Sequence, residues 1–245
     1  MRRLVLFSIL ASLAVAATAQ DRRSPLGFRI GQEYKDPRTV GSTTPPEVTL
    51  MRTAKCVAED RPGQVKAYLA TIPGTISEDE ALEAFGNKIR KCMPDMDFAG
   101  VGNAINARGT LSMRFEHSAM RGAMAEALIR DQKVAVDPAR FSIGDDGMYL
   151  AERFHGSRSQ VPARAFSLGF AGCVLGNSAS EMPELFNTAP ASPEERERVL
   201  AMAPAFGQCL MEGQELQLSP ATLRNQLAEV LYYAQFAAAQ AEEAE

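Results

Sequence analysis

The sequence predicts a mainly α-helical protein made of two tandem homologous units, each stapled by a disulfide, with a short β-hairpin in the connector. Three observations carry this prediction. Two pairs of cysteines have the same spacing of 36 positions, Cys56 with Cys92 and Cys173 with Cys209. A shift of 117 residues superimposes both pairs without a gap, and nine of the 39 compared positions are identical. Most of the other apolar positions stay apolar in both copies, as expected for a shared core.

The two copies correspond again further along the chain. Residues 120–128 match residues 223–231 at an offset of 103, so the first copy holds 14 additional residues, which we place within 95–108. We therefore expect unit 1 at 47–130, a connector at 131–160 and unit 2 at 161–236, followed by an acidic tail at 237–245. A period this long is not that of a short-helix solenoid.

The N-terminus has the pattern of a cleaved secretory signal peptide over residues 1–19. Arg2 and Arg3 supply its charge, an apolar run follows to Val15, and Ala17-Thr18-Ala19 is a small-residue cleavage site. The apolar run is shorter than the roughly 20 residues that a membrane-spanning helix needs. Residues 20–46 are rich in Pro, Gly, Ser, Thr and charge, which predicts an extended, flexible lead-in.

Three helices are expected in the first part of unit 1. The first starts near Pro46, the second covers about Pro62 to Ile72, and the third starts after Thr75. Apolar residues on the third recur at the helical period. They are Leu82, Phe85, Ile89 and Cys92. Unit 2 is expected to repeat this arrangement.

Both copies mark the start of the third helix in the same way. Thr75 with Glu78, and Ser192 with Glu195, have the spacing of a capping box, in which side chains satisfy free amides of the first turn. Pro204 interrupts this helix in unit 2, and a Gly-Asn pair weakens it at the same place in unit 1. The second cysteine of each unit is therefore expected on a short separate turn.

After the second cysteine, each unit has a brief alternating stretch, at 111–115 and 216–218, which predicts a short extended segment before the last helix. In the connector, the apolar runs 141–143 and 148–150 flank Gly144-Asp145-Asp146-Gly147. An Asp-Gly pair between apolar runs is typical of a β-hairpin.

The four cysteines of an exported chain are expected to form two disulfides. Three connectivities can be drawn for four cysteines. Each ancestral unit had two cysteines and had to be stable alone, so we predict the pairs Cys56–Cys92 and Cys173–Cys209. A zinc site is disfavoured because the chain lacks closely spaced Cys-x-x-Cys pairs.

Composition excludes one class of partner. Without residues 1–19, the chain has 24 basic and 30 acidic residues, a formal charge of −6. Nucleic-acid binding relies on neutralising phosphates, so it is not expected of this chain. No segment after the signal peptide is apolar enough to span a membrane.

No catalytic, cofactor-binding or metal-binding residue is predicted. His117 and His155 are the only histidines, and neither has the spacing of a metal ligand. His155 stands beside Ser157 and Ser159, but neighbours in sequence rarely form a nucleophile–base pair, so a polar loop is the better interpretation. His117 is interpreted as a surface residue at the start of a helix.

One polar pattern is repeated, Arg121 with Glu126 in unit 1 and Arg224 with Glu229 in unit 2. Residues five apart on a helix point about 140° away from each other, so they should not pair directly. We expect the arginine or the glutamate of each pair to bond a neighbouring helix of its own unit. The candidate partners are Glu78, Glu195, Glu80 and Glu197. Either these are structural ion pairs, or the two arginines line polar pockets that bind a ligand.

The repeated order is Cys-Val, an apolar helix, a capped helix ending in Cys, and then an Arg-containing helix with Ala-Glu-x-Leu. This order resembles a set of predicted secreted proteins of alphaproteobacteria that have no assigned activity. The resemblance covers 47–130 and 162–235. It implies an envelope or extracellular location and no catalytic residue.

The function expected from these features is non-catalytic: a periplasmic or secreted binding or interaction protein, with an envelope protein or a small ligand as its partner. An enzyme is the less favoured class. It would be a hydrolase of envelope or nutrient substrates with its site between the two units.

Overall fold

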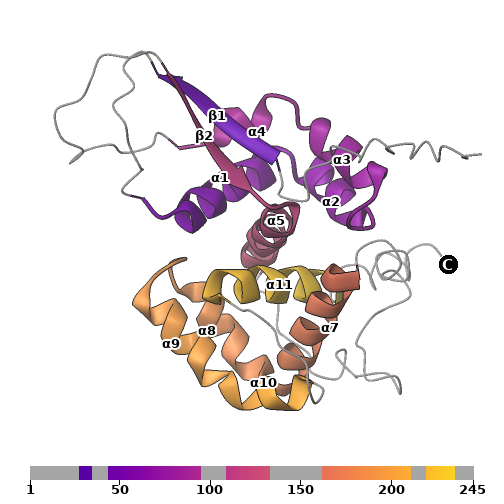
Figure 1. The fold of residues 1–245 in the computed structure, drawn as a ribbon, viewed down its shortest axis with the longest axis vertical. Helices are drawn as coiled ribbons and strands as arrows, with labels where there is room; N and C mark the ends of the chain where they lie inside the picture. The colour runs from indigo at the N-terminus through magenta and orange to yellow at the C-terminus, as the bar shows by residue number, and fades with distance from the viewer. Residues whose placement is uncertain (1–27, 35–43, 95–108, 133–161, 211–218, 235–245) are drawn as a thin grey trace, which may run out of the picture.

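The computed structural model of the protein describes residues 28–34, 44–94, 109–132, 162–210 and 219–234. Over these ranges the chain is mainly α-helical and carries two disulfides, which confirms this part of the prediction (Figure 1). The signal peptide at 1–19, the hairpin at 141–150, His155 and the tail at 237–245 lie outside the described residues.

Helices in the N-terminal half, residues 44–132, are α1 (Pro46–Asp60), α2 (Pro62–Ala70), α3 (Ile76–Glu83), α4 (Lys88–Cys92) and α5 (His117–Gln132). Those in the C-terminal half, residues 162–234, are α7 (Pro162–Asn177), the 3₁₀ helix η3 (Ala179–Glu181), α8 (Met182–Asn187), α9 (Pro193–Ala201), α10 (Ala203–Cys209) and α11 (Pro220–Tyr232).

The helix starts keep the two offsets read from the sequence. Helices α2 and η3 start at residues 62 and 179, and α3 and α9 at 76 and 193, an offset of 117 in both cases. Helices α5 and α11 start at 117 and 220, an offset of 103. The helices therefore follow a similar order in the two halves, with η3 and α8 at the place of α2, and β2 without a counterpart among the described residues.

Prolines define several helix starts. Pro46, Pro62, Pro193 and Pro220 each lie in the first turn of their helix, where a backbone N–H has no helical partner to lose. Ser219 adds a side-chain cap, accepting a hydrogen bond from the Thr222 backbone N–H at 3.1 Å. These helix starts follow from the residues at the boundary itself.

The predicted capping boxes form only in part. Ser192 Oγ accepts a hydrogen bond from the Glu195 backbone N–H at 3.1 Å, as expected. Thr75 does not cap α3, because its hydroxyl instead donates to the Ile72 carbonyl at 2.6 Å. The boxes fail for the two glutamates as well, since the backbone N–H groups of Thr75 and Ser192 bond carbonyls three residues earlier.

Glu78 and Glu195 instead bind the residue that precedes the expected cap. Glu78 Oε2 accepts from Gly74 N at 2.7 Å, and Glu195 Oε2 accepts from Ala191 N at 2.8 Å. Gly74 and Ala191 both have positive φ, 78° and 61°, the uncommon left-handed conformation. Each carboxylate thereby keeps its other oxygen, Oε1, for a different partner.

The predicted break before the second cysteine of each half is confirmed. Helix α3 ends at Glu83 and α4 starts at Lys88, with Gly86 at a φ of 51° between them. In the C-terminal half, α9 ends at Ala201 and α10 starts at Ala203, with proline in its first turn. Each second cysteine therefore lies on a short helix of its own.

Two strands, β1 (Phe28–Tyr34) and β2 (Gly109–Phe115), form an antiparallel pair. Their register places Phe28 opposite Phe115 and Tyr34 opposite Gly109. The extended segment predicted at 111–115 is confirmed, whereas its counterpart at 216–218 lies outside the described residues. The sequence analysis expected no strand in the lead-in, because a partner so distant in sequence leaves no local signal.

Helices α5 and α11 lie at the centre of the molecule and pack across each other between the two halves (Figure 1). Helix α1 covers α5 from one side, and α7 covers α11 from the other. At the crossing the backbones come very close, because a Cβ atom added to Gly122 would lie 2.3 Å from the Asn225 carbonyl oxygen. Only glycine fits at this point of α5.

We expect Gly122→Ala to lower the free energy of unfolding by about 2 kcal/mol, since the added methyl forces the two backbones apart. Gly207→Ala on α10 is the matched control, because nothing lies within 4 Å of the Cβ that it adds. This control should be neutral or gain up to about 1 kcal/mol from helix propensity. Urea unfolding of both variants measures the difference, and equal stabilities would show that the close approach is absent.

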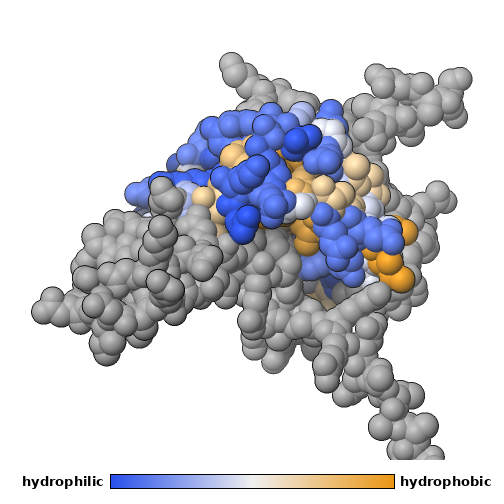
Figure 2. All heavy atoms as spheres, turned by 90° about the horizontal axis from the view of Figure 1, so that it is seen from above, coloured by the Kyte–Doolittle hydropathy of each residue, from blue (hydrophilic) through white to orange (hydrophobic). Residues whose placement is uncertain are grey.

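The face seen from above is mostly hydrophilic, with small hydrophobic areas between the polar ones (Figure 2). Across the described ranges, the large apolar side chains that are most exposed are Ile76 and Leu200, at 56% and 63%. Isolated exposed apolar residues are normal on protein surfaces. None of the described helices combines the length and the hydrophobicity that crossing a membrane requires.

Candidate functional site: two buried arginine–glutamate clusters

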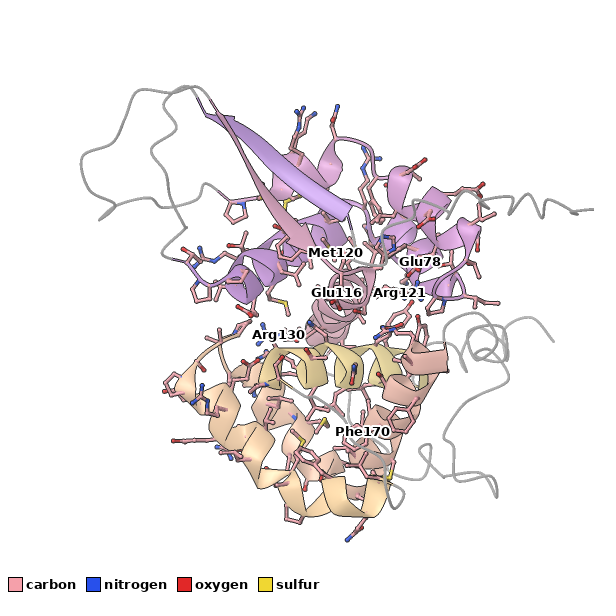
Figure 3. The ribbon with its side chains drawn as sticks, viewed as in Figure 1. Glu78, Glu116, Met120, Arg121, Arg130 and Phe170 are labelled. Carbon is pink, nitrogen blue, oxygen red and sulfur yellow. A yellow bond between two sulfur atoms is a disulfide. The ribbon has the colours of Figure 1, made fainter. Side chains whose placement is uncertain are left out.

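Arg121 on α5 is fully buried, with 0% of its surface exposed. Its Nη1 lies 3.1 Å from Glu78 Oε1 on α3, and its Nε lies 2.9 Å from Glu229 Oε1 on α11. Figure 3 shows Arg121 and Glu78 in the region where α3, α5 and α11 meet. Arg121, Glu78 and Glu229 are called the Arg121 cluster. It joins the N-terminal half to the C-terminal half.

Further acceptors complete the surroundings of the Arg121 guanidinium. Nη1 also donates to Thr71 Oγ1, and Nη2 donates to the Leu69 and Thr71 carbonyls, each at 3.0 Å. The Tyr68 ring lies 5.1 Å from the guanidinium carbon, within cation–π range. All three guanidinium nitrogens therefore donate to protein acceptors, which offsets the cost of burying the charge.

Arg224 on α11 has the same arrangement in the other half. Its Nη1 lies 3.0 Å from Glu195 Oε1 on α9, and its Nε and Nη2 bind both oxygens of Glu126 on α5 at 2.8 and 2.7 Å. Nη1 and Nη2 also donate to the hydroxyl and carbonyl of Thr188 at 3.1 Å. Arg224, Glu195 and Glu126 are called the Arg224 cluster.

The predicted partners are thus half right. Glu78 and Glu195 bind the arginine of their own half as expected, whereas Glu80 and Glu197 are exposed and take no part. The two arginines bond helices of their own halves, as expected, whereas the pairing of Glu126 and Glu229 with the arginine of the opposite half was not predicted. The crossing of α5 and α11 brings each glutamate to the other helix, and a single helix in sequence does not reveal that crossing.

Three other residues join the clusters, and each differs in type from the residue at its corresponding position in the other half. Just after α11, Tyr233 accepts a hydrogen bond from Arg121 and lies 3.1 Å from Glu229 Oε1. Arg164 on α7 pairs with the second oxygen of Glu229. Arg130 pairs with Glu126 at 3.3 Å. The sequence analysis did not find them because the two copies carry different residues at these positions.

Electrostatics keep the clusters charged. Burial acts to lower the pKa of Arg121, but Tyr233 and the carboxylates of Glu229 and Glu78 raise that pKa well above its usual value. Burial likewise opposes the charge on Arg224, and its pairs with Glu126 and Glu195 raise its pKa. The raised pKa values keep both arginines in their cationic form, as befits ion pairs that hold helices together.

His117 adds a titratable group to the Arg121 cluster only. Its Nδ1 lies 3.7 Å from Glu78 Oε2 and 3.8 Å from Asp79 Oδ1, and 28% of its side chain is exposed. The interaction with Glu78 raises the pKa of His117. Burial acts to raise the pKa of Glu78, but His117 and Arg121 lower it overall. The corresponding residue of the C-terminal half is Pro220, which does not titrate.

These shifts predict a pH window of greatest stability. The His117 contribution is complete below its ordinary pKa of 6.5 and is lost as the pH rises through the raised value. The Glu78 contribution is complete above 4.5 and is lost as the pH falls through the lowered value. We expect His117→Gln to lower the free energy of unfolding at about pH 5.5 and to change it little at about pH 8.5. Urea unfolding at the two pH values checks this, and a pH-independent effect would contradict it.

Both predicted disulfides are present. Cys56 on α1 joins Cys92 on α4, and Cys173 on α7 joins Cys209 on α10, with Cα–Cα distances of 5.5 and 5.6 Å. Each bond therefore ties the first helix of its half to the short helix that follows the break. The two bonds hold corresponding helices, and neither crosses between the halves.

The described residues were also expected to hold no metal site. Over the ranges that the structure describes, no three His, Cys, Asp or Glu side chains form a group that could hold a metal ion. The histidine at the Arg121 cluster is engaged by carboxylates of α3. No family model, curated protein or solved structure matches the chain.

Proposed function

We propose that the protein is an exported, non-catalytic binding or interaction protein of the bacterial envelope, made of two homologous helical units. The observation that carries the proposal is that the repeated arginines bond only to groups of the protein itself. Arg121 and Arg224 donate from all their nitrogens to protein acceptors, so these groups join the halves and are not turned toward a substrate. The surfaces outside the clusters are then what a partner would contact.

Several corresponding contacts support the homology of the two units. Thr71 and Thr188, 117 residues apart, receive the arginine of their own half through both hydroxyl and carbonyl oxygens. Gly74 and Ala191, also 117 apart, share a positive φ and the same hydrogen bond to a glutamate. A local hydrogen-bonding pattern repeated at a fixed offset is expected of duplicated units and is unusual by chance.

Disulfide chemistry supports export. Disulfides persist in oxidising compartments such as the bacterial periplasm and are rare in the cytosol. Both cysteine pairs of this chain are bonded. The signal-peptide pattern at 1–19 and the resemblance to secreted proteins of alphaproteobacteria point the same way.

The hydrolase alternative would require a site between the two units. The described residues enclose a cavity of about 10 Å³ there, next to Glu195 and Arg224. A space of that size holds about one water molecule, far below the several hundred cubic ångströms of a typical substrate pocket. This space is therefore too small to be the substrate site that the hydrolase alternative places between the units.

In vivo crosslinking of the tagged protein in its native envelope, followed by mass spectrometry, tests the proposed function. We expect a near-stoichiometric envelope protein to co-purify. A tagged chain that lacks residues 1–19 is the matched control and should not recover that partner, because it stays in the cytosol. Recovery of the same proteins with both chains would count against an envelope partner.

The same pair of chains tests export through the cysteines. We expect the full-length chain, recovered from cells, to resist thiol alkylation until it is reduced, and the chain without residues 1–19 to be alkylated at once. Gel mobility after alkylation with a heavy maleimide measures the number of free thiols. Free thiols in the full-length chain would overturn the assignment to an oxidising compartment.

A further inference from the structure

The small cavity beside the Arg224 cluster lies between the two halves. Helix α1 contributes Glu47 and Leu50, and α5 contributes Ala123. Helices α9 and α11 contribute Glu195, Arg224 and Asn225. These six residues are among the nine that line the space of about 10 Å³, which is called the Glu47 niche. It is open on one side to solvent, so a group can enter from outside.

In the region of the Arg121 cluster that corresponds to the Glu47 niche, two longer side chains are present. At an offset of 117, Arg164 corresponds to Glu47, and at an offset of 103, Gln226 corresponds to Ala123. Arg164 points its guanidinium at Glu229 with only 10% of its side chain exposed, and Gln226 is 6% exposed. Two long side chains therefore fill the region that a short alanine and an acidic residue leave partly empty at the Glu47 niche.

The charges of the niche favour a cation. Arg224 is already bound by Glu195 and Glu126, and Glu126 also receives Arg130. These four groups balance to zero formal charge. Glu47 is only partly buried and makes no ion pair with any described residue, so among the described residues it adds one negative charge that no cation balances at the niche. A carboxylate at the edge of a small polar cavity attracts a cationic group most strongly when water is displaced.

We propose that the Glu47 niche binds the cationic end of a ligand, a primary ammonium or one amino group at the edge of a guanidinium, at the position that corresponds to Arg164 of the other half. The inference rests on the proposed binding function and names the chemistry of its ligand. The cationic end contacts Glu47 and Glu195, and the rest of the ligand stays in solvent because the niche has room for little more. The group can belong to a free amine or to an arginine side chain of a protein.

Calorimetric titration of the full exported protein with agmatine tests the proposal. Butylurea, which is similar in shape but uncharged, is the control ligand, and a blocked Gly-Arg-Gly peptide represents the protein source. We expect agmatine to bind in the millimolar range and butylurea not to bind. Binding of the peptide but not of agmatine would assign the niche to a protein side chain. Failure of every cationic probe at about 10 mM would overturn the proposal.

Glu47→Arg is the decisive variant, because it recreates the residue that the other half has. We expect it to weaken agmatine binding at least about tenfold and to raise the melting temperature, as the new guanidinium fills the niche. Glu47→Gln should weaken binding without raising the melting temperature. Glu83→Arg, the same charge change at an exposed site of α3, should leave binding unchanged. Unaltered binding in Glu47→Arg would overturn the site.

These outcomes separate the two proposals. An envelope partner recovered by crosslinking, with no binding of any cation, would overturn the niche and leave the proposed function standing. Agmatine binding that Glu47→Arg abolishes, with no protein partner recovered, would support the niche and overturn the protein partner in favour of a small amine.

Discussion

Arg121→Met is expected to lower the free energy of unfolding by about 3–5 kcal/mol, the usual cost of removing one member of a buried ion pair. The substitution keeps much of the side-chain volume, but it leaves Glu78 buried without its arginine and Glu229 with Arg164 as its remaining cation. It also removes the hydrogen-bond donor of the Tyr68 and Leu69 carbonyls in α2 and of the Thr71 hydroxyl that follows α2. Urea unfolding followed by circular dichroism measures the loss.

Two further variants show where that loss comes from. Arg121→Met combined with Glu78→Gln should recover part of it, because the buried carboxylate that lost its arginine is then neutral. Arg224→Met should cost a similar amount, since its cluster has the same architecture. A melting temperature unchanged by Arg224→Ala, with loss of some ligand, would instead show that the arginine lines a binding pocket.

Removing the C-terminal disulfide with the Cys173→Ala/Cys209→Ala double variant is expected to cost about 4 kcal/mol. The bond closes a loop across a separation of 36 residues, and its loss releases the entropy of that loop in the unfolded chain. The bond ties α10, which lies on the side of its half away from α5, to α7, which packs against α11 (Figure 1). Chemical denaturation of the double variant under oxidising conditions measures the effect.

The N-terminal disulfide provides the matched comparison, because it has the same separation and joins corresponding helices. Cys56→Ala/Cys92→Ala should therefore cost a similar amount. Hydrogen exchange should report early opening of α1 and α4 in this variant, and of α7 and α10 in the other. Identical exchange patterns in both variants would contradict the placement of one bond in each half.

Local sequence signals predicted the helices well. Pro46, Pro62, Pro193 and Pro220 mark helix starts because proline suits the first turn whatever lies around it. The paired cysteines were equally informative, because a duplicated spacing leaves one connectivity that serves each unit alone. These features depend on residues close together in sequence or on the repeat itself.

Contacts between distant segments were harder to predict. The repeated Arg and Glu residues identified the helix faces of the clusters, but not that Glu126 and Glu229 reach across to the opposite half. The pairing of β1 with β2 was missed for the same reason. Tyr233 and Arg164 gave no repeated signal at all, since each has a different residue at its corresponding position. Thr71 and Thr188 did give one, because they are identical in both copies.

The contact between Gly122 and Asn225 has a consequence for how the two halves fit. Two identical helices crossing on a symmetry axis would present the same residue from both sides, glycine against glycine or asparagine against asparagine. The first pairing leaves a gap and the second a collision. In this chain one helix gives up its side chain and the other fills the space. The two helix surfaces are therefore complementary to each other and not to copies of themselves, so the contact between the halves depends on the difference between Gly122 and Asn225.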